Sequence, residues 1–168
     1  MDERIERILD GILDAHDRRQ AIIKKELERF KAEHGLFLSR FSEKARTVIR
    51  PHFQEVGIYL KNRGHDYEIS EDKEQIGYDG TLTRPAGITL SITPKCEGTI
   101  ELNRQNRPQV AFTVNRSKDT VCVRESTMMP NKSGSVRDAE EYELDAITPT
   151  VIDKHIVRVL SVSMGKED

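Results

Sequence analysis

The stretch TVIRPHFQEVGIYL, residues 47–60, has the apolar spacing of a helix but carries Pro51 in its middle. Proline lacks a backbone N–H and clashes with the preceding turn, which costs about 3 kcal/mol inside a continuous helix. It fits well in the first turn of a new helix. We therefore predict a kink or a helix start near Arg50. This joint divides the chain into a helical arm, residues 1–50, and a two-layer α+β domain, residues 51–168.

Upstream of the joint, apolar residues recur at three- and four-residue spacing. One series repeats every seven residues, at Leu9, His16, Ile23, Phe30 and Phe37. Such a seam is typical of a coiled coil or a helical hairpin. Gly35 either ends the first helix or is tolerated within one long helix, at a cost of about 1 kcal/mol. The predicted oligomerisation seam comprises Ile5, Leu9, Ile12, Ile23, Leu27, Phe30 and Phe37.

Charge is distributed unevenly along the predicted arm. Residues 1–17 hold six acids and two bases, a net charge of −4, whereas residues 18–63 hold twelve bases and five acids, a net charge of +7. An antiparallel helix pair would place acidic segments against basic ones. Such a pair forms between two chains, or within one chain if Gly35 permits a turn. We favour a homodimer through the N-terminal helices, because Gly35 lacks surrounding turn residues.

Downstream of residue 64 the apolar period changes from helical to alternating, which is typical of strands with one buried face. Short linkers between the strands favour antiparallel hairpins. The C-terminal segment has the signals of a helix, with Pro149 at its start and Gly165 at its end. The predicted fold is α+β: a mostly antiparallel sheet of about five strands, covered on one face by helices. The predicted strands are DYEIS (66–70), GITLSIT (87–93), TIELN (99–103), QVAFTVN (109–115), TVCVRE (120–125) and YELDA (142–146); STMMPNKSGSVRD (126–138) is predicted to be a loop.

The composition favours a cytoplasmic protein without membrane association. The net charge is −2 at pH 7 and the isoelectric point about 6.2, so no global field attracts the chain to nucleic acid or anionic lipid. The N-terminus is charged where a signal peptide would be apolar, and no apolar run is long enough to span a membrane. The two cysteines, Cys96 and Cys122, are far apart and are expected to be free thiols.

Motifs that would indicate an enzyme are missing from the sequence. It contains no P-loop, no Gly-rich dinucleotide turn, no G-x-S-x-G and no H-E-x-x-H. We expect the five histidines to have structural roles: His16 and His34 occupy seam positions, and a metal or general-base role for His52 or His65 would need acidic or histidine partners that converge in space. No residue is therefore assigned to catalysis, to a cofactor or to a metal, and the question of enzymatic activity is open, with a non-enzyme favoured.

Three functions are compatible with these observations. The leading hypothesis is a non-enzymatic interaction or scaffold protein that oligomerises through its N-terminal helices. The second is nucleic-acid binding through the basic stretch 18–63 and cations of the hairpin loops, although base-stacking aromatic residues are missing from the polar sheet face. The third is an enzyme of unfamiliar type with a pocket between arm and sheet. The possible nucleic-acid contacts are Arg104, Arg107, Arg116 and Lys118.

Overall fold

The structure is a computed structural model that describes residues 2–95, 106–130 and 133–165. The chain divides into two compact units, Met1–Phe37 and Leu38–Asp168. The first unit is helical from Glu3 onward and forms most of helix α1, Glu3–Lys44. The arm boundary predicted at residue 50 stays a prediction.

Helix α1 is one uninterrupted helix rather than a hairpin. It begins where Asp2 Oδ1 accepts a hydrogen bond of 3.0 Å from the backbone N–H of Arg4, and its first turn carries Glu3 and Glu6. Acidic groups at this end interact favourably with the helix dipole. Gly35 lies within the helix, and a side chain there would meet no atom within 4 Å. The helix therefore continues through Gly35 without a turn.

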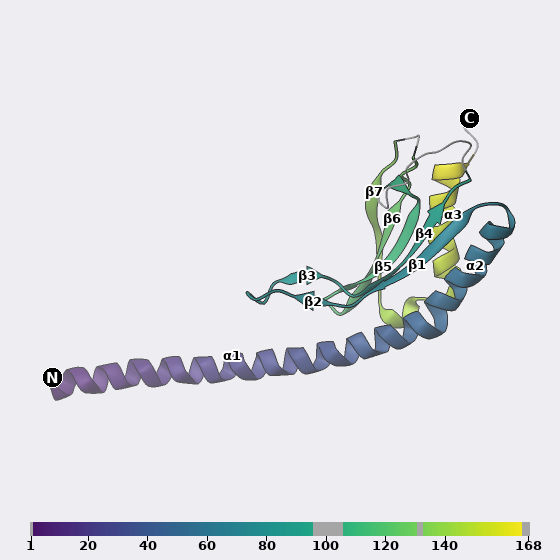
Figure 1. Cartoon of the computed structure of the whole chain (residues 1–168). Helices are drawn as coiled ribbons and strands as arrows, with labels where there is room; N and C mark the ends of the chain where they lie inside the picture. The colour runs from purple at the N-terminus through teal and green to yellow at the C-terminus, as the bar shows by residue number, and fades with distance from the viewer. Residues whose placement is uncertain (1, 96–105, 131–132, 166–168) are drawn as a thin grey trace. The chain divides into compact units, whose positions relative to one another are not determined.

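Pro51 lies at the joint between two helices, as the sequence predicts. A π-helical turn, η1 (Ala45–Ile49), follows α1, and α2 (Arg50–Asn62) begins with Pro51 as its second residue. The N–H of Arg50 donates to the carbonyl of Ala45, five residues back, so the chain widens by one residue immediately before the proline. This π-turn accommodates the missing donor of Pro51. The helical axis changes direction through it (Figure 1).

Helix α2 ends at a left-handed glycine. Gly64 has φ +90, a conformation that side-chain-bearing residues rarely adopt. The N–H of His65 donates to the carbonyl of Leu60, and that of Gly64 donates to Lys61. These two bonds form a Schellman motif, which satisfies carbonyls of the last helical turn.

Five antiparallel strands form the main sheet in the order β1-β4-β5-β6-β7. A separate two-stranded sheet pairs β2 with β3. Figure 1 shows α2 and α3 side by side with the main sheet. The bounds are β1 Asp66–Asp72, β2 Gln75–Ile76, β3 Leu82–Arg84, β4 Gly87–Thr93, β5 Gln109–Asn115, β6 Thr120–Ser126, β7 Val136–Tyr142, the 3-10 turn η3 Leu144–Ala146 and α3 Pro149–Met164.

The apolar face of the main sheet forms the core, which confirms the one-sided alternation predicted for β4, β5 and β6. The register places Ile88 opposite Phe112 and Phe112 opposite Val123. Helix α2 packs on β1 and β4, and α3 packs on β5 and β6. The predicted strand TIELN, with Ile100 and Leu102, lies outside the described residues. The buried sheet residues are Ile88, Leu90, Ile92, Val110, Phe112, Val114, Val121 and Val123.

The prediction for the last strand was wrong. YELDA contributes only Tyr142 to a strand, and Leu144–Ala146 form the 3-10 turn η3. The last strand is β7, whose first half lies in the segment predicted as a loop. Strand β7 is an edge strand of sequence VRDAEEY, so its inward positions carry charged and polar side chains instead of alternating apolar ones. A β-bulge between Val123 and Arg124 further shifts its register.

Candidate functional site

The predicted oligomerisation seam forms a largely exposed apolar surface on α1. The side chains of its first five members are between 41% and 57% exposed. Phe30 is half-buried and its ring stacks on His34, with ring centroids 5.8 Å apart, whereas Phe37 is buried. Four further large apolar residues, Ile8, Leu13, Ile22 and Leu36, are also more than half exposed on this helix. Leaving such side chains in water costs about 1 kcal/mol each, so the surface favours association.

The cations of the hairpin loops are engaged by carboxylates. Arg107 has a side chain only 11% exposed, and its guanidinium lies 3.6 Å from Glu68. Arg116 forms an ion pair with Glu74, and Lys118 lies 3.6 Å from Glu141. These pairs reduce the positive charge available to phosphates.

Arg104, the fourth predicted contact, lies outside the described residues. Each of the three described cations, Arg107, Arg116 and Lys118, therefore lies next to a carboxylate. Nucleic-acid binding through these residues stays a prediction.

A second candidate site is a cluster of polar side chains between α3 and strands β6 and β7. Glu125 occupies an inward position of β6, in the same cross-strand row as the buried Leu90 and Val110. Its side chain is 2% exposed. Since an isolated buried carboxylate is very costly, it requires partners that supply hydrogen bonds and positive charge.

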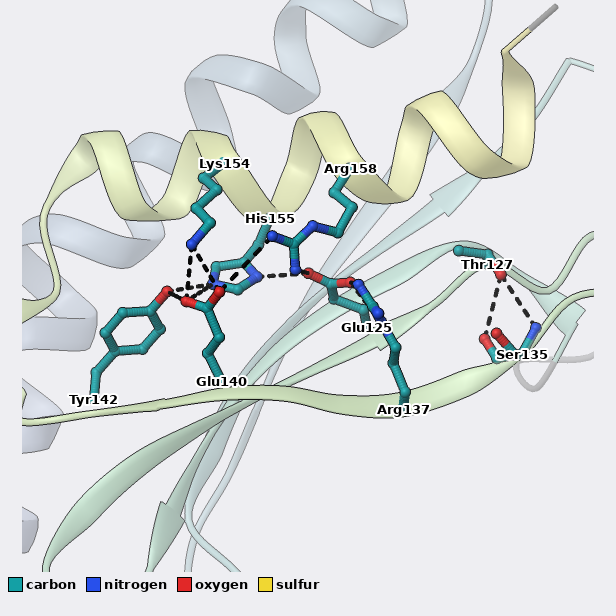
Figure 2. A network of polar contacts seen from close by, with 9 residues as sticks. All are labelled: Glu125, Thr127, Ser135, Arg137, Glu140, Tyr142, Lys154, His155 and Arg158. Atoms are coloured by element: carbon teal, nitrogen blue, oxygen red, sulfur yellow. Dashed lines mark hydrogen bonds and ion pairs between the residues drawn. The ribbon is translucent and has the colours of Figure 1, made fainter.

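Three cationic or imidazole groups surround Glu125 (Figure 2). Nδ1 of His155, on α3, lies 2.6 Å from Oε1. Arg137, on β7, donates to Oε2 from Nε and Nη2 at 3.2 and 3.0 Å. Nη1 of Arg158, one turn beyond His155 on α3, donates to Oε1 at 3.3 Å. The carboxylate therefore joins the helix to the edge of the sheet.

The other nitrogen of His155 continues the chain of contacts. Nε2 lies 2.8 Å from the hydroxyl of Tyr142, which donates to Glu140. Lys154 donates to both oxygens of Glu140, at 2.7 and 2.9 Å. Hydrogen bonds from Lys154 and Tyr142 lower the pKa of Glu140 from 4.5 to about 2. Burial and the hydrogen bond to Glu140 raise the pKa of Tyr142 from 10.0 to about 12.

Chemically, a carboxylate, an imidazole and a phenol in line can relay a proton, and here the first two are buried while Tyr142 is half-buried. His155 is fully buried and Glu125 is 1% exposed. The ring of His155 also packs edge-on against Phe112 and Tyr142. The imidazole itself is shielded from solvent, and its contacts link α3 to β6 and β7.

A cavity of about 370 Å³ lies between the C-terminal end of α1 and the sheet, within the second unit. Leu38, Phe41 and Ala45 supply its apolar wall, and its polar wall includes Glu71 and Glu74. Both carboxylates form ion pairs with arginines, and the lining holds neither histidine nor cysteine. Ser42, Asp72 and Lys73 also line it. Among the described residues, no group of three metal-binding side chains converges.

Further observations bear on the remaining sequence predictions. His52 lies 2.6 Å from Asp153 and joins α2 to α3, and His65 accepts a hydrogen bond from the backbone N–H of Lys95. Both are structural contacts. No helix in the described part of the chain is long and apolar enough to cross a bilayer.

Sequence reasoning missed the partnership of Glu125 and His155. Each carried a local signal: Glu125 follows Val121 and Val123 at inward spacing, and His155 lies on the apolar stripe of α3 beside Ile152 and Ile156. A charged residue at one buried position and a histidine at another would together have suggested a pair.

Comparison with known proteins returned no similar family, curated protein or solved structure. The geometry itself defines the class of protein: an α+β domain whose sheet has one covered face, linked to a long N-terminal helix with an exposed apolar surface.

Proposed function

We propose that this protein is a non-enzymatic interaction protein that self-associates through helix α1. The observation that carries the proposal is the apolar surface of the first unit, where Ile12 and Ile23 remain 57% and 55% exposed. An isolated helix gains its stability mainly from packing an apolar face, so a helix with this surface requires a partner.

The interior of the second unit is compatible with the same proposal. The centre of its polar cluster, Glu125 and His155, is buried, and the lining of the cavity beside the C-terminal end of α1 holds neither histidine nor cysteine. The most extended exposed apolar surface is on helix α1. A protein of this design serves as a dimeric scaffold, in which the α+β domain presents surfaces to other molecules.

The test is the mass of the full chain by light scattering at micromolar concentrations. We expect twice the chain mass of 19.3 kDa for the unaltered protein and 19.3 kDa for the variant Ile12→Glu/Ile23→Glu. Ile58→Glu is the matched control, because Ile58 is 55% exposed on α2 and should leave the dimer intact. A monomeric unaltered protein would refute the proposal. A dimer that persists in the double variant would place the interface elsewhere.

A further inference from the structure

We propose that α1 pairs with α1 of a second copy in antiparallel orientation, with the two-fold axis between Asp17 and Arg18. This inference rests on the proposed function and adds the identity, direction and register of the partner. In this register, residue i of one copy lies opposite residue 35 − i of the other. The proposed pairing follows from the order of the apolar, polar and charged side chains along α1.

One stripe of side chains on α1 repeats every 11 residues. Ile5, His16 and Leu27 form one series, and Ile8, Arg19 and Phe30 form a second; Ile12 and Ile23 complete the stripe. An 11-residue repeat corresponds to about 3.67 residues per turn, close to the 3.6 of a straight helix. These side chains therefore stay on one side of α1 over the whole segment.

This stripe is complementary to itself only when two copies run in opposite directions. In the proposed register Ile5 lies opposite Phe30, Ile8 opposite Leu27, and Ile12 opposite Ile23. The two-fold axis repeats each pair, so all six apolar positions find an apolar partner in both chains. Any other antiparallel offset brings together at most one pair of these six residues.

The polar residues of the stripe fall at the centre of the pair. His16 lies opposite Arg19, on either side of the two-fold axis. A polar layer within an apolar seam disfavours shifted registers, in which those side chains would meet apolar ones. A parallel in-register pair would instead place Arg19 against Arg19 and bring the two acidic N-terminal segments together.

Charges beside the stripe agree with the same register. With 3.6 residues per turn, Glu6 and Lys31 project from one flank of the stripe, and Arg4 and Glu33 from the other. In an antiparallel pair each flank meets the same flank of the partner. Glu6 then lies near Lys31 of the second copy, and Arg4 near Glu33 of the second copy. Both are pairs of opposite charge.

The partner cannot be another part of the same helix. Helix α1 runs uninterrupted from Glu3 to Lys44, so residues 5–12 cannot fold back onto residues 23–30 of the same chain. The complementary surface is present in each molecule, which makes a second copy the occupant.

The direct measurement is the distance between spin labels in the dimer. Single cysteines replace Glu3, Asp14 or Ala32 in the full chain carrying Cys96→Ser and Cys122→Ser, after light scattering has confirmed its mass. These three sites lie on the side of α1 away from the stripe. In the proposed register the labels at Glu3 and at Ala32 are separated along the axis by the same distance, about 44 Å, and those at Asp14 by about 10 Å, at 1.5 Å per residue.

Each other outcome overturns a defined part of the argument. Equal and short distances at all three sites mean a parallel pair, which refutes this inference and leaves the self-association proposal standing. Unequal distances at Glu3 and Ala32 mean a different antiparallel register. A monomeric mass with no distance at any site refutes the proposed function itself.

Charge reversal provides an independent check without labels. Glu6→Lys and Lys31→Glu should each weaken dimerisation about tenfold, because each creates two like-charge contacts, and the double variant should restore it. Asp10→Lys, the same charge change on the far side of the helix, is the matched control and should have little effect. Failure of the double variant to recover affinity would contradict the register.

Discussion

Replacing Glu125 by leucine should destabilise the second unit strongly, although leucine is the more typical residue for the sheet core. The carboxylate is 2% exposed and bonded to a fully buried imidazole at 2.6 Å. Its removal leaves Nδ1 of His155 without an acceptor in an apolar setting. Breaking a buried pair by removing one partner typically costs about 3 to 5 kcal/mol.

We expect the loss of unfolding free energy to lie near the lower end of that range. Arg137 and Arg158 also lose an acceptor, but their side chains are 55% and 32% exposed and can turn to solvent. Only the imidazole is stranded. We therefore expect Glu125→Leu to lower the free energy of unfolding by about 3 kcal/mol.

The double variant Glu125→Leu/His155→Leu separates pairing from packing. It removes both buried polar groups, while Tyr142 keeps its hydrogen bond to Glu140. Replacement of a buried pair by apolar residues is often neutral, so we expect stability within about 1 kcal/mol of the unaltered protein. The coupling free energy of the double-mutant cycle should then exceed about 2 kcal/mol.

The assay is urea unfolding followed by tyrosine fluorescence, because the chain has no tryptophan and its four tyrosines all lie beyond residue 38. The signal therefore reports the second unit and not the N-terminal helix. The matched control is the cycle of Arg124 and Asp138, an ion pair of 3.2 Å whose side chains are 60% and 71% exposed. Its coupling should be at most about 1 kcal/mol.

Two results would refute this reasoning. A loss below about 1 kcal/mol in Glu125→Leu would mean that the carboxylate contributes no more than an exposed group. A double variant as unstable as the sum of its single variants would mean that Glu125 and His155 act independently.

Three further predictions concern individual residues of the second unit, and Gly35 of the first unit provides a comparison for one of them. Gly57→Ala should lower the free energy of unfolding by about 1 to 3 kcal/mol, because an added Cβ would lie 2.5 Å from the ring of Tyr67. Gly35→Ala should instead stabilise its helix, because an added Cβ there would meet no atom within 4 Å. Equal shifts of the melting temperature in the two variants would contradict the close contact between Gly57 and Tyr67. The pKa of Tyr142 is raised from 10.0 to about 12, so the stability that this phenol contributes is present below pH 10 and lost as pH rises toward 12. Subtracting the ultraviolet phenolate titration of Tyr142→Phe from that of the unaltered protein should isolate a transition near pH 12, and one near pH 10 would be inconsistent with it. Burial and the nearby Glu141 raise the pKa of the Cys122 thiol, so thiol reagents should modify it slowly at neutral pH until the protein is unfolded. Peptide mapping follows the modification. Fast modification in the folded state would show an accessible thiolate.

The sequence alone determined the elements whose signals are local. The proline joint depends on the missing N–H of Pro51 and on the residues of one turn, and the end of α2 depends on Gly64. The alternation in β4, β5 and β6 shows their inward faces directly, because side chains in a strand point to opposite faces in turn. Such features require only a few neighbouring residues and were predictable.

Tertiary structure decided what depends on residues far apart in the chain. Glu125 and His155 are 30 residues apart, and neither position by itself shows that the two side chains meet. Strand β7 has no apolar alternation, because its inward side chains are held by ion pairs to α3 and β6. Its identity as a strand therefore depends on its partners. Local periodicity encodes the elements, whereas the pairing of buried charges is set by register and by helix placement, which no short stretch of sequence contains.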